Sequence, residues 1–153
     1  MSNMNIDEVL HAFADAESCW LSTTRSNGSP HVVPVWFVWH EGAAWVYSAA
    51  TTVHTRNVRQ RPQAVIHLAD THEALILDVA AEVIAGNTAW AVEALGPLFM
   101  AKYALDVVAE HARHETAFVR FAPQVVRAWG KAGFHRWRLT EGKWQSDGAF
   151  APF

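Results

Sequence analysis

The fold is decided by the stretch HVVPVWFVWH, residues 31–40. Its β-branched and aromatic residues predict a strand, and the Asn-Gly pair in segment 26–29 predicts a hairpin turn from a preceding strand at Cys19–Arg25. Pro34 has no N–H to donate to a strand ladder, so it indicates a sheet edge, a bulge or a split in a barrel. We expect backbone groups beside Pro34 to be open to a ligand, although an ordinary edge strand explains this proline equally well.

A helix start follows the next strand along the chain. Residues 44–49 predict a strand that ends in small side chains, and Thr51 or Thr52 can cap a helix over Val53–Gln60. Backbone N–H groups, threonine hydroxyls and a protonated His54 could meet a phosphate at this helix start. Such binding should tighten as pH falls toward about 6, near the ordinary pKa of histidine. On these residues alone, a capped surface helix without a ligand is the simpler interpretation.

The remaining elements are mostly short strands. A leading helix is expected near residues 6–13, and Glu41-Gly42 and segment 130–133 are expected to be turns. Further strands are expected at 64–69, 75–85, 117–121, 124–129 and 134–139. A helix is expected from Asn87 or Thr88 to Ala94, and Gly96-Pro97 is expected to separate it from a second helical piece at 98–104. An exposed tail is expected from Glu141. This pattern predicts a mainly β fold, a closed or split antiparallel β-barrel with few helices.

Composition excludes several classes of function. The 153 residues, 51% of them hydrophobic, can form one domain, residues 1–153, without disulfide or metal support. A net charge of −3 argues against nucleic acid or an anionic membrane as partner. The longest apolar run, residues 74–85, contains Asp78 and Glu82 and is too short to span a bilayer, so we expect a cytoplasmic protein.

Candidate reactive residues are few. Cys19 is the sole cysteine and is expected to be a buried apolar side chain in a strand rather than a nucleophile. His111 and His114 have a spacing that could place two imidazoles together, but no further ligands lie nearby, so no metal site is expected. The glycine-rich signatures of dinucleotide and P-loop sites are absent from the sequence.

A family resemblance rests on residues 21–37, LSTTRSNGSPHVVPVWF. This segment resembles the opening of the pyridoxamine 5′-phosphate oxidase-like, FMN-binding split barrels, especially their flavin/deazaflavin oxidoreductase branch. The likeness continues through Asn57 and Pro62 to Asp78-Val79, and resumes near residues 128–131 and at 135–136. The family usually has lysine where His54 stands, often preceded by arginine where Val53 stands, and these bases hold the cofactor phosphate.

The resemblance implies a homodimer with FMN or the deazaflavin coenzyme F420 bound at the subunit interface. It implies hydride transfer between this cofactor and a small, conjugated substrate. Trp129, Arg136 and Trp137 are expected to reach the cofactor across the interface, and His31 and His54 to flank it, with no catalytic residue assigned. The residues expected to bind the cofactor are Val33, Pro34, Val35, Trp36, Ser48, Ala49, Thr51, Thr52, His54, Asn57, Trp129 and Arg136.

Two other interpretations stay open. One is a non-catalytic flavin- or haem-binding protein, or a family member that has lost its cofactor, since His54 replaces the phosphate-holding lysine. The other is a purely structural dimerisation domain, which explains the apolar segment Trp90–Tyr103 but not the threonine-rich helix start.

Overall fold

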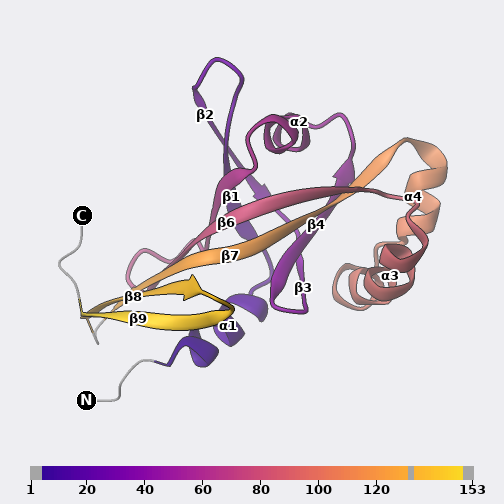
Figure 1. Cartoon of the computed structure of the whole chain (residues 1–153). Coiled ribbons are helices and arrows are strands. Elements are labelled where there is room, and N and C mark those ends of the chain that lie inside the picture. Colours follow the sequence, from indigo (N-terminus) through magenta and orange to yellow (C-terminus); the bar gives the residue numbers. More distant parts are fainter. Residues whose placement is uncertain (1–4, 131–132, 150–153) are drawn as a thin grey trace.

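The described part of the chain folds as a split antiparallel β-barrel with four helices at its ends and side (Figure 1). The computed structural model describes residues 5–130 and 133–149. The helices are α1 (Ile6–Ala14), α2 (Val53–Gln60), α3 (Ala89–Tyr103) and α4 (Val107–Arg113). The strands are β1 (Cys19–Thr24), β2 (Pro30–Val35), β3 (Val38–His40), β4 (Ala43–Ala49), β5 (Gln63–His67), β6 (Ala74–Ala85), β7 (Thr116–Gly130), β8 (Gly133–Thr140) and β9 (Lys143–Ala149).

The strand order explains how the barrel closes. Neighbouring strands follow the path β2-β1-β5-β6-β7-β4-β3, and the hairpin of β8 and β9 extends from β7. The two ends of this path, β2 and β3, are consecutive in the sequence, so the chain itself joins them through Trp36 and Phe37. The expectation of one strand over residues 31–40 is therefore wrong: its first part pairs with β1 and its last part with β4.

Side chains of α3 hold the break between β2 and β3. The Tyr103 hydroxyl accepts a hydrogen bond from the Phe37 N–H (3.0 Å), and its oxygen lies 2.8 Å from the Phe37 carbonyl and 2.5 Å from the Glu17 carbonyl, either of which can accept its proton. Lys102 Nζ donates to the Phe37 carbonyl at 2.9 Å. The Trp36 ring stacks on the Tyr103 ring, with centroids 4.6 Å apart. The backbone groups that lose strand partners at the break are thus satisfied by α3.

Helix α3 is continuous, although Gly96-Pro97 was expected to interrupt it. Pro97 lacks the N–H of one helical hydrogen bond, but Leu95 and Phe99 on either side of it are buried in the same cluster, which keeps the helix in place. Gly96 faces α4 closely, since a Cβ there would lie 3.3 Å from Val107 Cγ2. The sequence did not predict α4 itself.

Two strands also differ from expectation. Strand β7 runs unbroken through Pro123, because its register against β6 shifts there: Asp78 faces Val125 and Val79 faces Pro123, which leaves Gln124 as the extra residue of a bulge. The expected exposed tail is instead β9, which pairs with β8 through a two-residue turn at Glu141-Gly142 with positive φ angles. Lys131 and Ala132 of the expected turn, and residues 150–153 of the tail, lie outside the described residues.

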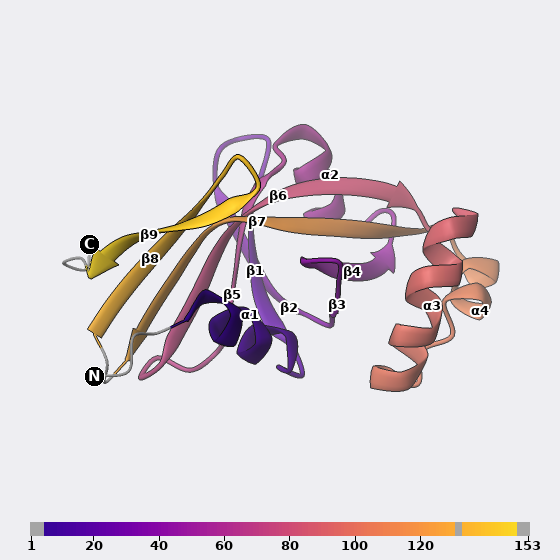
Figure 2. The ribbon, with the colours of Figure 1, turned by 60° about the horizontal axis from the view of Figure 1, so that its bottom comes forward.

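Two apolar clusters stabilise the part of the chain that the structure describes. The larger fills the barrel and includes fully buried rings and aliphatic side chains, among them Phe13, Leu21, Phe37, Ile66, Leu77 and Phe121. Helix α1 contributes Val9 and Phe13 to this cluster and covers one end of the barrel (Figure 2). The smaller cluster joins α3 and α4 to β4 and β7 at the opposite end from the β8–β9 hairpin. Expected strands at β1, β4, β5, β6 and β8, and expected helices at α1 and α2, are confirmed.

The contact of α3 with the break predicts that Tyr103→Phe lowers the free energy of unfolding by about 1–3 kcal/mol, because buried Phe37 backbone groups lose their partner while the ring is retained. Urea unfolding followed by circular dichroism measures this loss. Trp36→Phe, which keeps an aromatic ring on Tyr103, should cost clearly less. Equal stability of Tyr103→Phe and the parent would contradict the role given to this hydroxyl.

Candidate functional site

The start of α2 follows directly on the end of β4. Thr52 is the N-cap: its Oγ1 accepts from the Thr55 N–H at 3.3 Å and lies 2.8 Å from Thr55 Oγ1, while its own N–H donates to the Ala49 carbonyl at 3.2 Å. Ala50 N–H donates to the Glu115 carbonyl at 3.0 Å, which fixes the connection against the chain entering β7. The predicted cap is therefore confirmed at Thr52, and Thr51 is exposed beside it.

His54 lies in the same group of side chains. Its Nε2 is 3.2 Å from Ser48 Oγ and 3.3 Å from Thr52 Oγ1, and the side chain is buried. Residues from the end of β4 and the first turn of α2 thus converge as the sequence predicted. The arrangement presents two hydroxyls, one imidazole and the first N–H groups of a helix within a small region.

Burial changes the chemistry of His54. Desolvation, with a further contribution from nearby His31, lowers the pKa of His54 from 6.5 to about 4. The imidazole is therefore neutral at physiological pH. The expected change in protonation near pH 6 is wrong for the protein without a ligand, because that expectation assumed an exposed side chain.

Strand β2 supplies the other side of the region. His31, Val33 and Val35 alternate with the exposed Val32, Pro34 and Trp36, so the first three face the barrel interior. The sheet path ends at β2, which makes Pro34 part of an edge strand, as one of its expected interpretations required. In β4, residues 46–49 pair with β7 but extend beyond the short β3. Among the described residues, both strands therefore have an edge without a strand partner.

Asn57 holds α2 on β1. Its Nδ2 donates to Thr23 Oγ1 at 3.0 Å, and both side chains are buried. Thr23 faces His31 across the β1–β2 ladder. Asn57 was expected to bind the cofactor, and the contact that its side chain makes is with this strand.

Trp129 and Arg136 lie far from this region in the same chain. Ser48 pairs with Ala117 near the start of β7, whereas Trp129 is twelve residues further along that strand, a length of about 40 Å at roughly 3.3 Å per residue. Trp129 Nε1 donates to the Thr71 carbonyl at 3.1 Å, and Arg136 Nε donates to Asp147 Oδ2 at 2.6 Å. One chain therefore does not bring all the expected cofactor residues together.

Comparison with known proteins identifies the family. The model of the pyridoxamine 5′-phosphate oxidase family matches residues 6–130, which is most of the chain. The chain belongs to this family. No curated protein sequence matches it.

Solved structures share the fold of this family member at low sequence identity. A pyridoxamine 5′-phosphate oxidase-related, FMN-binding protein from Nostoc punctiforme is 17% identical, with 96% of this chain and 95% of that chain covered and a TM-score of 0.68. The haem storage protein HutZ from Vibrio cholerae is 17% identical, with 78% of this chain and 87% of HutZ covered and a TM-score of 0.63. An F420 reductase is 15% identical, with 81% of this chain and 97% of the reductase chain covered and a TM-score of 0.59.

The structure also places Cys19 and His111, the other candidate reactive residues of the sequence. Cys19 is buried in β1 as expected, and burial raises the pKa of its thiol to about 12, which leaves no reactive thiolate. His111 Nδ1 lies 2.8 Å from Thr116 Oγ1, and the described part of the chain contains no group of three or more potential metal ligands. Within the described ranges, no helix is long and apolar enough to cross a membrane.

From the sequence, His31 was expected to flank the cofactor but was not among the residues expected to bind it. Its place on the inward face of β2 follows from the alternation of side chains, counted back from the buried Val35. The proximity of His31 to His54 joins β2 to α2, and such a contact has no local signal in the sequence.

The lowered pKa of His54 predicts a stability change with pH in this family member. The unfolded chain binds a proton near pH 6.5, but the folded chain does so only near pH 4, so the stability due to neutral His54 is present above 6.5 and is lost as pH falls through this window. The full difference corresponds to about 3 kcal/mol. Between pH 7 and pH 4, the free energy of unfolding measured in urea should fall less for His54→Gln than for the parent. His67→Gln, which changes a half-exposed histidine of β5, should show the same fall as the parent. Parallel losses in parent and His54→Gln would contradict the buried neutral state.

Proposed function

We propose that this chain is an oxidoreductase that binds FMN or the deazaflavin coenzyme F420. The observation that carries the proposal is the convergence of Ser48, Thr52 and His54 at the start of α2, next to the open edge of β2. The family and the similarity of fold to an FMN-binding protein and an F420 reductase support a flavin-type cofactor.

The donor set fits a phosphate. The N–H groups of Val53 and His54 in the first turn of α2 have no intrahelical partner, whereas that of Thr55 is capped by Thr52 Oγ1. The hydroxyls of Ser48 and Thr52 lie at the same helix start, beside His54. The site lacks the lysine that is usual in the family, and neutral His54 donates at most one hydrogen bond. Phosphate binding here therefore depends on neutral donors and the helix terminus more than on permanent charge.

The edge of β2 fits a planar ring. Backbone groups of Val33 to Trp36 lie at the end of the sheet path, where ring carbonyl and N–H groups can hydrogen-bond to main chain. Ala49 is small and lets a ligand approach the β4 backbone. When bound, the ring supplies hydride transfer to or from a small conjugated substrate, and the protein orients both.

A homodimer completes the proposed site. Because about 40 Å of β7 separates the Ser48 region from Trp129, a second copy is the means by which Trp129 and Arg136 reach the cofactor. Apolar side chains on the outer face of β1 and β2 support this, since Trp20, Val32 and Trp36 are 37%, 52% and 55% exposed. A hollow of about 650 Å³ over β1, β5 and β6 continues this face.

The dimer gives a direct prediction. Light scattering at micromolar concentration should report twice the chain mass of 17.0 kDa. Val32→Lys with Trp36→Lys places charge on the outer face of β2 and should shift the protein toward monomer, whereas Met100→Lys on α3, a similarly exposed position, should leave the mass unchanged. A monomeric parent protein would contradict the shared site.

The second candidate is binding without turnover, of a flavin or of haem. Two observations favour it: His54 is neutral and replaces the family lysine, and the fold is similar to that of the haem storage protein HutZ. A neutral imidazole is a common metal ligand. This candidate predicts tight haem binding and no hydride transfer from reduced flavin or deazaflavin to quinone-type acceptors.

Adding a charge at residue 54 tests the cofactor site. His54→Lys should tighten FMN and F420 binding about tenfold to a hundredfold near pH 7, since a hydrogen bond to a charged group contributes roughly 1.5–3 kcal/mol. Fluorescence titration measures both dissociation constants. Gln60→Lys adds the same charge at the other end of α2 and should have little effect. If His54→Lys binds both cofactors no better than Gln60→Lys, the phosphate is not bound at this helix start.

A further inference from the structure

His31 has a buried polar atom that no contact explains. Its Nδ1 is inaccessible to solvent and has no hydrogen-bond partner among the described residues, the sole buried side-chain nitrogen or oxygen there of which this is true. Leaving such an atom unpaired costs free energy, so native structures usually provide a partner. A ligand that displaces the side-chain atoms now covering Nδ1 can be this partner.

The fold brings His31 to the same region as His54. Thr23 faces His31 across the β1–β2 ladder and accepts the hydrogen bond from Asn57 of α2. His54 precedes Asn57 by three residues, so the two lie on the same face of the helix, and both are buried. The contribution of His31 to the lowered pKa of His54 agrees with this placement of the two imidazoles on neighbouring elements.

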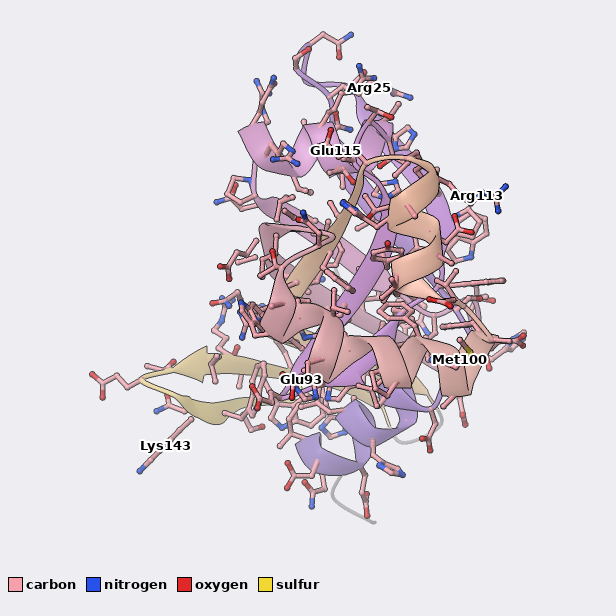
Figure 3. The ribbon with its side chains drawn as sticks, turned by 90° about the vertical axis from the view of Figure 1, so that its right-hand side faces the viewer. Arg25, Glu93, Met100, Arg113, Glu115 and Lys143 are labelled. Atoms are coloured by element: carbon pink, nitrogen blue, oxygen red, sulfur yellow. The ribbon has the colours of Figure 1, made fainter. Side chains whose placement is uncertain are left out.

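Among the described residues, no carboxylate lies within hydrogen-bond distance of His54. The groups within hydrogen-bond distance of His54 Nε2 are the hydroxyls of Ser48 and Thr52, and no acidic residue contributes to the shift of its pKa. Ionisable side chains on the surrounding elements are exposed: Arg25 at the end of β1, Arg56 on α2 and Glu115 before β7. Arg25 and Glu115 lie at the same end of the molecule as α2 (Figure 3). Hydroxyl and imidazole donors beside His54, together with the unpartnered Nδ1 of His31, form a region suited to an anion from outside.

We propose that His31 is a second phosphate-binding imidazole, whose Nδ1–H donates to an oxygen of the cofactor phosphate opposite His54. The inference rests on the proposed function, in which a phosphate-bearing planar cofactor binds at the start of α2. His31 would then take over part of the phosphate binding that a lysine at residue 54 would otherwise provide. The ligand class is a phosphate ester of a planar ring system.

The test compares FMN with riboflavin, which lacks the phosphate. In the parent protein FMN should bind more tightly than riboflavin. His31→Leu, which removes the donor, should weaken FMN binding about tenfold to a hundredfold with riboflavin binding unchanged, because a charge-assisted hydrogen bond is lost. His31→Asn places a neutral amide near the position of Nδ1 and should recover part of the loss. A merely structural role of His31 would weaken both ligands alike.

His67→Leu is the matched control, because His67 is also a half-buried strand histidine, but its Nδ1 lies 3.0 Å from the Leu68 carbonyl. It should leave the ratio of FMN to riboflavin affinity unchanged. If the parent prefers FMN and His31→Leu keeps the full preference, the role of His31 is overturned while the cofactor site stands.

A second measurement separates this inference from the proposed function. Inorganic phosphate should raise the thermal unfolding midpoint of the parent above that in chloride of equal ionic strength, and His31→Leu should lose this shift. If no flavin or deazaflavin binds but the phosphate shift is present and depends on His31, the proposed function fails and the anion site is supported. A shift that is absent in the parent, or equal in His31→Leu, overturns the anion site.

Discussion

The hydrogen bonds between the Phe37 backbone and α3 are the interaction on which the rest of the architecture depends. Phe37 lies between β2, which pairs with β1, and β3, which pairs with β4. Its N–H and C=O therefore belong to neither ladder. Tyr103 and Lys102 provide their partners from a helix 65 or 66 residues further along the chain. The Phe37 ring is fully buried in the barrel core, which fixes the position of the break. Because the break is fixed, β2 remains an edge strand.

This edge sets the chemistry of the candidate site. An open β2 lies beside the start of α2, and α2 is held on β1 by the buried bond from Asn57 to Thr23. The same burial that positions His54 removes its charge, so the phosphate of the proposed cofactor would meet a helix terminus, hydroxyls and imidazoles. In the function that we propose, this donor set should hold the cofactor phosphate more weakly than a site with lysine at residue 54.

Features with local signals were predictable from sequence, and features set by distant contacts were not. The Asn-Gly hairpin, the Glu41-Gly42 turn and the Thr52 cap follow from backbone preferences of a few residues, and the structure contains all three. The division of segment 31–40 depends on Tyr103, and the continuity of α3 through Pro97 depends on packing against β4 and β7. In the candidate site, the grouping of Ser48, Thr52 and His54 is local and was expected, whereas the burial of His54 and its proximity to His31 arise from the tertiary structure.

A visible absorption spectrum of the freshly purified protein tests the central claim most directly, since flavin, deazaflavin and haem absorb differently. The account predicts the spectrum of an oxidised flavin or deazaflavin, either as purified or after incubation with FMN or F420 and removal of the excess. The bound chromophore should bleach on chemical reduction and recover on adding a quinone. A haem spectrum as purified, or no retained chromophore with either cofactor in the parent protein and in His54→Lys, would contradict the account.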